Sequence, residues 1–222
     1  MSVILAVAAH PDDETLGCGG SLLRHRTEGD EIHWLIMTTI SVEAGFNIKR
    51  VNSRKGEIAS VADTYGFNSV HQTKFITSQL DTLAKSVLID EVSSIINKVK
   101  PDTIYLPFRN DIHSDHTTVF DAVAACTKSF RYPFIQRVRA YETLSETEFA
   151  IRPDPVGFKP NLWIDIADYL DEKLKIMQIY KGEMDAHPFP RSEKNIRALA
   201  TLRGATVGRK AAESFVTLKE IL

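Results

Sequence analysis

The chain has 222 residues, with 27 lysines and arginines against 29 aspartates and glutamates, and a formal net charge of −2. This near balance argues against nucleic acid or an anionic membrane as a partner. The two cysteines, Cys18 and Cys126, are too few for a disulfide framework, and the first apolar run is too short for a signal peptide or a membrane span, so we expect a cytoplasmic protein.

Apolar runs alternate with amphipathic stretches through most of the chain. In chain order, the pattern predicts a strand over residues 3–9, a helix over 16–27, a strand over 31–39, a helix over 50–65, a strand over 69–76, a helix over 82–99, a strand over 103–108, a helix over 116–130, strands over 137–144 and 161–166, and a helix over 168–180. Strands separated by helices of this length indicate the α/β class, with a parallel sheet covered on both faces. The length suits one domain over residues 1–222.

Two clusters of histidine and aspartate follow predicted strands, one after residues 3–9 and one after residues 103–108. Their polar members are His10, Asp12, Asp13, Glu14, His113, Asp115 and His116. Parallel sheets bind ligands beyond the carboxyl ends of their strands, so we expect both clusters at one edge of the sheet. Pro11 fixes the turn after His10 and lets Asp13 converge with it, and the three-residue spacing brings His113 and His116 to one side.

Histidine and aspartate together can supply a complete ligand set for one divalent metal ion. Catalytic zinc commonly takes three such ligands and leaves a position open for water, whose pKa the metal lowers toward neutrality. The residues in the two clusters exceed what a closed structural site needs, which suggests an acid and a base beside the metal. Ferrous iron, cobalt or manganese would also suit these ligands.

The glycine-rich stretch over residues 17–20 has two interpretations. Glycines between a strand and a helix could cradle a phosphate, or they could allow close packing of the helix on the sheet. Because three acids precede them and would repel a phosphate, we favour close packing, with Cys18 as a packed side chain.

These motifs resemble those of the LmbE/PIG-L-type zinc N-deacetylases. The likeness lies in the sequence Ala-His-Pro-Asp-Asp-Glu that ends at Glu14, the glycines after it, and Asp-Ile-His-Ser-Asp-His that ends at His116. The pair Arg54 and Glu57, and the late stretch Ala-Glu-x-Phe that ends at Phe215, resemble two weaker motifs of the family.

The resemblance implies a Rossmann-like domain with a mostly parallel sheet, and one zinc ion held by His10, Asp13 and His116. It also implies Asp12 as the general base for the attacking water. His113, held by Asp115, would stabilise the oxyanion or protonate the leaving amine. The substrate implied is a small N-acetylated amino sugar or glycoconjugate precursor.

Several assignments stay open at this stage. Asp115 could instead cap the following helix, or do both. Arg54 could bind a substrate oxygen or simply pair with Glu57. Glu142, which directly follows the strand-like residues 139–141, could reach the pocket. We expect loops to shape that pocket, namely residues 41–49, 77–80, 130–137 and 152–159.

The leading hypothesis is therefore a zinc-dependent amide hydrolase. The alternatives are hydrolysis of another bond, such as an ester or phosphoester, and a non-catalytic module that binds metal and sugar. The acidic loops argue against a phosphodiesterase, which would want two metals or more basic groups. The sequence leaves the oligomeric state open, including a homo-oligomer.

Overall fold

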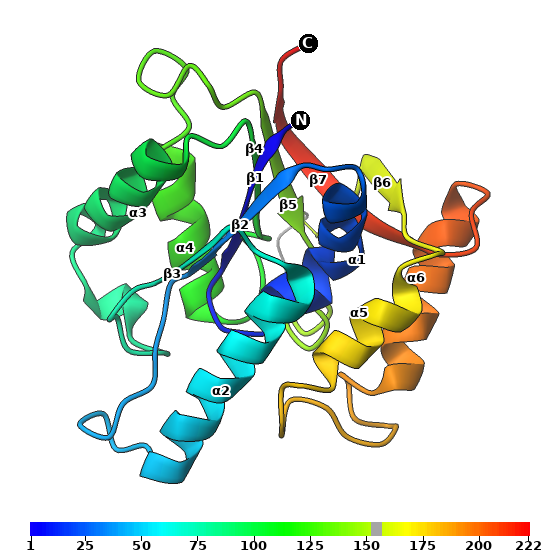
Figure 1. The fold of residues 1–222 in the computed structure, drawn as a ribbon, viewed down its shortest axis with the longest axis horizontal. Helices are drawn as coiled ribbons and strands as arrows, with labels where there is room; N and C mark the ends of the chain where they lie inside the picture. Colours follow the sequence, from blue (N-terminus) through cyan, green and yellow to red (C-terminus); the bar gives the residue numbers. More distant parts are fainter. Residues whose placement is uncertain (152–156) are drawn as a thin grey trace.

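The computed structural model of the protein describes residues 1–151 and 157–222. Its strands form one seven-stranded sheet with the order β3-β2-β1-β4-β5-β7-β6 (Figure 1). The strands are β1 (Val3–Ala8), β2 (Glu31–Ile36), β3 (Ser69–Gln72), β4 (Thr103–Pro107), β5 (Arg137–Tyr141), β6 (Leu162–Asp165) and β7 (Ala212–Glu220). The helices are α1 (Asp13–Thr27), α2 (Ile48–Tyr65), α3 (Lys85–Val99), α4 (Ser114–Ala125), α5 (Leu170–Met177) and α6 (Glu193–Thr206), with a 3-10 turn at Leu80–Thr82.

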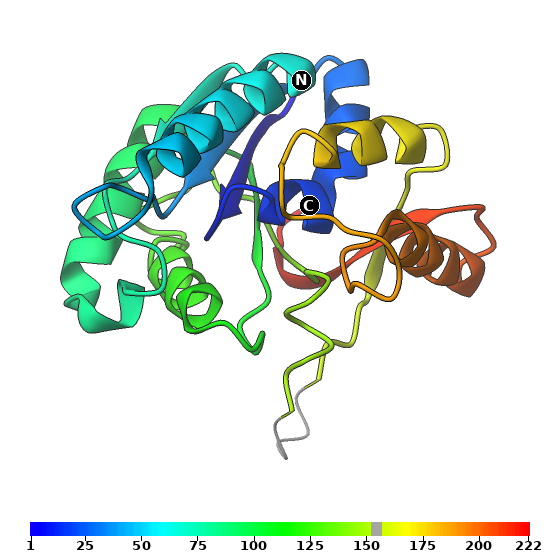
Figure 2. The same ribbon diagram turned by 90° about the horizontal axis from the view of Figure 1, so that it is seen from below.

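The sheet is mostly parallel and is covered on both faces, which confirms the predicted α/β class. β3, β2, β1, β4 and β5 run parallel, whereas β7 pairs antiparallel with both β5 and β6. Figure 2 shows α1, α2 and α5 on one side of the sheet and α3 and α4 on the other. Alternate residues of β1 divide between the two cores: Leu5 and Val7 pack with α3 and α4, and Ile4 and Ala6 pack with α1 and α2.

The predicted elements agree with the structure in kind and differ mainly at their ends. The helix predicted over 50–65 ends as expected at Gly66, whose φ of 70° is the left-handed conformation that glycine adopts readily. The helix predicted over 116–130 begins earlier, at Ser114, and ends at Ala125. α6 and β7 were not predicted, although Ser192 is a typical N-cap and accepts a hydrogen bond from the N–H of Asn195.

α1 has a kink that places its first turn beside the sheet edge. Cys18 has non-helical dihedral angles (φ −138°, ψ 17°), which interrupts the hydrogen bonding of the helix. The carboxylate of Glu213 on β7 accepts hydrogen bonds from the N–H groups of Gly20 (2.9 Å) and Ser21 (2.7 Å), as at a helix N-terminus. Lys173 on α5 pairs with the same carboxylate at 2.7 Å, and both side chains are buried. Glu213 therefore joins α1, α5 and β7.

The glycines of α1 allow the close packing that the sequence suggested. A Cβ at Gly17 would overlap the ring of Tyr141, and one at Gly20 would lie 2.8 Å from Ile166. Cys18 is fully buried in the core between α1 and the sheet.

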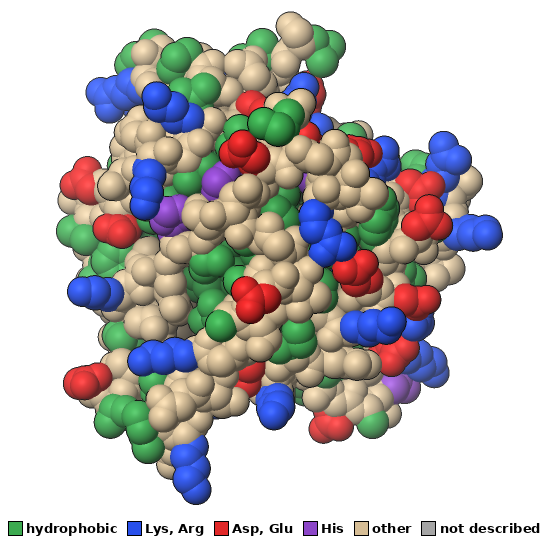
Figure 3. Space-filling view, viewed as in Figure 1, with side chains coloured by type: hydrophobic (Ala, Val, Ile, Leu, Met, Phe, Trp, Pro, Cys, Tyr) green, Lys and Arg blue, Asp and Glu red, His purple; other side chains and the backbone are tan. Residues whose placement is uncertain are grey.

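The surface gives no sign of a single charged patch on the face drawn in Figure 3, where lysines and arginines are interspersed with aspartates and glutamates. Among the described residues, no helix has both the length and the apolar character needed to cross a bilayer.

Candidate metal centre and catalytic cavity

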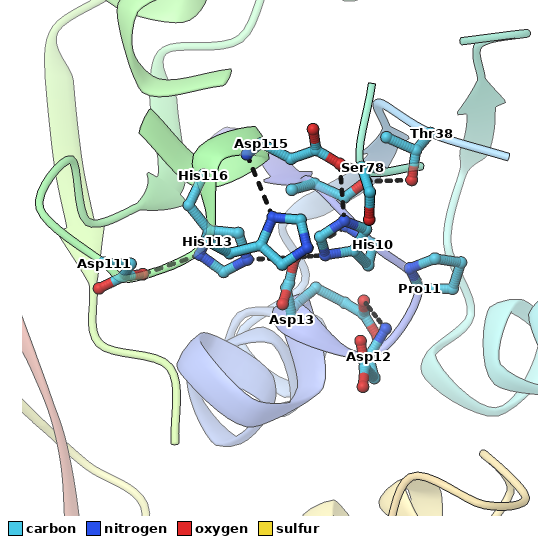
Figure 4. A network of polar contacts seen from close by, with 12 residues as sticks. His10, Pro11, Asp12, Asp13, Thr38, Ser78, Asp111, His113, Asp115 and His116 are labelled. Atoms are coloured by element: carbon cyan, nitrogen blue, oxygen red, sulfur yellow. Dashed lines mark hydrogen bonds and ion pairs between the residues drawn. The ribbon is translucent and has the colours of Figure 1, made fainter. Parts of the chain in front are cut away.

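Two neighbouring strands bring the histidine clusters together. β1 and β4 pair in parallel, with Ile4 opposite Thr103, so both strands end at the same edge of the sheet. The turn after β1 carries His10, and the loop after β4 leads to His113 at the start of α4. As a result, the ring centroid of His10 lies 4.4 Å from that of His113 and 5.6 Å from that of His116 (Figure 4).

A carboxylate orients the imidazole of His10. Its Nε2 lies 3.0 Å from Oδ2 of Asp115, and its Nδ1 lies 3.7 Å from Oδ2 of Asp13. A carboxylate accepts hydrogen bonds, so this contact places the ring proton on Nε2 and leaves Nδ1 with a lone pair facing Asp13.

The imidazole of His116 is oriented in the same way by a second carboxylate. Its Nδ1 lies 2.8 Å from Oδ2 of Asp111, whose other oxygen accepts a hydrogen bond from Thr147 at 2.7 Å. Its Nε2 is buried, makes no hydrogen bond to any described residue, and lies 3.3 Å from Oδ2 of Asp13. Nε2 of His116 therefore faces Asp13 and has no hydrogen-bond partner among the described residues.

The donor atoms of His10, Asp13 and His116 fit a divalent metal ion. They lie within 4.8 Å of one another, and two imidazole nitrogens with one carboxylate oxygen form a ligand set of the zinc type. Each imidazole has a carboxylate on its other nitrogen, as metal-binding histidines usually do. A second group, His10, His113 and Asp115, also lies close together, but the Asp115 carboxylate there already accepts N–H groups of Ser78 and Leu80.

Electrostatics show that this cluster attracts positive charge. Burial opposes the protonated form of His116, but Asp13 and Asp111 outweigh it and raise the pKa of His116 well above its ordinary value. Burial likewise opposes ionisation of Asp13, yet His116 and His10 hold its pKa below the ordinary range. The carboxylates of Asp13 and Asp111 thus favour a positive charge at this position, as a metal-binding site requires.

His113 caps α4 and has a defined tautomer. Its Nδ1 accepts a hydrogen bond from the backbone N–H of Asp115 at 3.1 Å, which leaves the ring proton of neutral His113 on Nε2. Burial and the neighbouring His10 lower the pKa of His113, so the ring favours the neutral form. The resemblance implied that Asp115 holds His113, but its carboxylate makes its hydrogen bonds with His10 and with the N–H groups of Ser78 and Leu80 instead.

Asp12 has a strained backbone and a buried carboxyl group. Its φ is 138°, a value that residues other than glycine rarely adopt. Two hydrogen bonds fix this backbone: the N–H of Asp12 donates to Glu14 (3.2 Å), and the N–H of Leu16 donates to the Asp12 carbonyl (2.9 Å). Burial, with Asp13 and Glu183, raises the pKa of Asp12 against the opposing effect of Arg191 and Arg54. Nη1 of Arg191 lies 3.2 Å from Oδ2 of Asp12.

A cavity of about 280 Å³ opens beside these groups. Its lining residues are His10, Pro11, Asp12, Asp13, Thr38, Thr39, Ile40, Phe46, Arg50, Arg54, Gln72, Thr77, His113, Glu146, Glu183 and Arg191. Two of the four predicted loops contribute, through Phe46 and Thr77. The loop predicted over 130–137 does not, and residues 152–156 of the fourth lie outside the described residues.

The two candidate substrate residues have different places. Arg54 lines the cavity, donates to the Pro11 carbonyl at 2.7 Å, and pairs with Glu57 at 3.3 Å. The pairing with Glu57 is therefore confirmed, and a contact of Arg54 with the substrate stays a prediction. Glu142 does not line this cavity, because Arg203 (2.6 and 2.7 Å) and Ser214 (2.8 Å) hold its carboxylate.

Four residues of the site were not predicted from the sequence: Asp111, Glu146, Glu183 and Arg191. Asp111 belongs to the motif that ends at His116, and only its pairing with that histidine was not foreseen. The other three lie in irregular segments where no periodicity indicates a direction for the side chain.

Comparison with known proteins identifies the family. Residues 5–127 match the family described as PIG-L: GlcNAc-PI de-N-acetylase, which is more than half of the chain. The chain belongs to the PIG-L family. It is 31% identical over 188 residues to the uncharacterized deacetylase YaiS of Escherichia coli K12, covering 81% of this chain and 90% of YaiS. It is 21% identical over 225 residues to a diacetylchitobiose deacetylase of Thermococcus kodakarensis, covering 95% of this chain and 80% of that protein.

Solved structures share the fold of this PIG-L protein. The conserved protein TT1542 of Thermus thermophilus superimposes with a TM-score of 0.77 at 23% identity, over 100% of this chain and 97% of that one. GalB, a 4-carboxy-2-hydroxymuconate hydratase of Pseudomonas putida KT2440, superimposes with a TM-score of 0.73 at 16% identity, over 100% and 98%. Because a hydratase shares it, the fold alone does not determine the reaction.

Proposed function

We propose that this PIG-L deacetylase removes the acetyl group from an N-acetylated amino sugar or related glycoconjugate, using one divalent metal ion, with zinc as the first candidate. The observation that carries the proposal is the convergence of His10, Asp13 and His116 beside a cavity that Asp12 and His113 also line. The family description and the name of the Thermococcus relative support an N-acetylated sugar as the substrate.

In this proposal the metal would be held by Nδ1 of His10, a carboxylate oxygen of Asp13 and Nε2 of His116. Asp115 and Asp111 accept the remaining ring protons and keep both imidazoles in the binding tautomer. A metal ion bound there lowers the pKa of water and polarises the amide carbonyl.

Asp12 acts as the general base and then as the general acid. Its carboxylate accepts a proton from the attacking water and holds that proton until the amine leaves. Arg191, 3.2 Å from Oδ2, limits the directions in which the carboxylate can turn. The amide C–N bond breaks as the proton passes from Asp12 to the departing nitrogen, which gives acetate and a free amine.

His113 stabilises the tetrahedral oxyanion in this scheme. The backbone N–H of Asp115 occupies Nδ1, so the neutral ring can donate only through Nε2. The lowered pKa of His113 favours this neutral donor over an imidazolium acid.

Acetate release tests the proposal. The protein loaded with zinc should release acetate from N-acetylglucosamine or N,N'-diacetylchitobiose, and both chelation and Asp12→Asn should lower the rate by at least about 100-fold. Asp63→Asn is the matched control, since this carboxyl group lies on α2 and does not line the cavity. Full activity after chelation, or release of phosphate from phosphoesters without release of acetate, would contradict the proposal.

A further inference from the structure

Glu146 lines the catalytic cavity, and its carboxylate has no hydrogen-bond or ion-pair partner among the residues that the structure describes. It lines the same cavity as His10, Asp12, Asp13 and His113. Among the residues that the structure describes, none donates a hydrogen bond to this carboxylate or pairs with it as an ion. The other acids that line the cavity are all engaged, Asp12 with Arg191, Asp13 with the histidines, and Glu183 with three arginines.

The backbone around Glu146 is fixed by several hydrogen bonds. Ser145, just before it, has a φ of 74°, a strained conformation for a side chain other than glycine. The N–H of Glu146 donates to the carbonyl of Thr143 (3.1 Å), and its carbonyl accepts the N–H of Ile112 (3.1 Å). Thr147, the next residue, donates to Asp111, which orients His116. The loop that carries Glu146 is therefore hydrogen-bonded directly to the loop after β4, which contains Asp111 and Ile112.

A partly buried carboxylate without a donor is costly, and sites that bind polar ligands contain such groups because the ligand supplies the donor. Burial also raises the pKa of Glu146, against the opposing effect of His116 and His10. Sugar hydroxyls are donors of the required kind.

We propose that Glu146 is a substrate-binding residue that accepts a hydrogen bond from a sugar hydroxyl and so sets specificity for the sugar. This assignment rests on the proposed function and adds a residue to it. Glu146 does not take part in the chemical step, so its loss should act on KM rather than on kcat.

The test uses N-acetylglucosamine and its 3-deoxy, 4-deoxy and 6-deoxy analogues with the zinc-loaded protein, measuring affinity by calorimetry and acetate release. Glu146→Gln should raise KM by about 10- to 100-fold and leave kcat within about threefold. With the wild type, one deoxy analogue should have a KM that is higher than that of N-acetylglucosamine by the same factor. With Glu146→Gln, the KM of that analogue and of N-acetylglucosamine should be equal. Glu148→Gln is the matched control, because Glu148 accepts the N–H of Ser145 in the same loop and does not line the cavity.

The outcomes separate the two proposals. If the wild type binds and hydrolyses these sugars while Glu146→Gln matches it in KM, the role of Glu146 is overturned and the proposed function stands. If the wild type neither binds nor hydrolyses any of them, the sugar substrate and the role of Glu146 both fail. The thermal stability of Glu146→Gln should equal or exceed that of the wild type, since the carboxylate has no partner to lose among the described residues.

Discussion

Oδ2 of Asp115 lies 3.0 Å from Nε2 of His10, and this contact turns the Nδ1 of His10 toward Asp13. The same carboxylate accepts the N–H groups of Ser78 (2.6 Å) and Leu80 (3.2 Å), which fix it in place. Asp115 therefore links the loop after β3, the start of α4 and the turn after β1. The orientation of a candidate metal ligand depends on a residue that is more than a hundred positions away in the sequence.

This relationship predicts that Asp115→Asn weakens metal binding. The amide keeps an oxygen for only one of the two backbone N–H groups, and it no longer holds His10 through a charge, so zinc affinity should fall by about 10- to 100-fold. Competition with a chromophoric chelator measures the change. Asp121→Asn, which alters an ion-paired residue of α4 away from the site, should bind zinc like the wild type.

A second prediction concerns the strained backbone at Asp12. Both Asp12→Ala and Asp12→Gly should abolish activity, since both remove the proposed base. Glycine adopts a φ of 138° without the strain of a Cβ, so Asp12→Gly should be more stable than Asp12→Ala by about 1 kcal/mol or more. Chemical denaturation of the two metal-free variants gives the difference. Equal stabilities would show that the backbone relaxes when the carboxylate is removed.

A third prediction follows from the buried Glu14. Burial raises its pKa from 4.5 to about 7, although it accepts hydrogen bonds from Thr15 and Tyr180. Between these values the folded protein keeps a proton that the unfolded chain has released. The contribution of Glu14 to the free energy of unfolding therefore falls as the pH rises from about 4.5 to about 7.

Glu14→Gln removes that dependence. The free energy of unfolding of the metal-free variant should fall less between pH 5 and pH 8 than that of the wild type, by roughly 2.5 kcal/mol. Urea titrations at several pH values measure the two curves. Parallel curves for the two proteins would mean that Glu14 is not protonated in the folded state near pH 6.

A fourth prediction tests the buried pair of Lys173 and Glu213. Glu213→Gln leaves Lys173 buried without its counter-charge and weakens the contacts with Gly20 and Ser21, so the variant should lose about 3–5 kcal/mol of unfolding free energy. Glu172→Gln, at the neighbouring position on α5, breaks a half-exposed pair with Arg26 and should cost about 0–1 kcal/mol. Similar losses in both variants would argue against a special role for Glu213.

Much of this fold was predictable from the sequence, because local patterns determined it. The buried strand over residues 3–9 and the strand over 103–108 were visible as apolar runs, and the parallel arrangement then required their ends to meet. Gly66 marked the end of α2 in the same local way. These features depend on residues close in sequence.

The remaining features depend on contacts between distant segments. Asp115 was expected beside His113, its near neighbour, but the loop at Ser78 and Leu80 draws its carboxylate to His10. Glu142 was expected at the pocket, yet Arg203 of the unpredicted α6 binds it, and Glu146 in the next turn lines the cavity instead. The Ala-Glu-x-Phe motif was weak in the sequence, and only the kink at Cys18 explains its glutamate.

The most direct test of the central claim is anomalous diffraction from crystals of the zinc-loaded protein, collected at the zinc edge. The account predicts one strong peak, at about 2.0–2.2 Å from Nδ1 of His10, a carboxylate oxygen of Asp13 and Nε2 of His116. A site with no peak after zinc loading, or an ion bound through other residues while His116 Nε2 stays unligated, would contradict it.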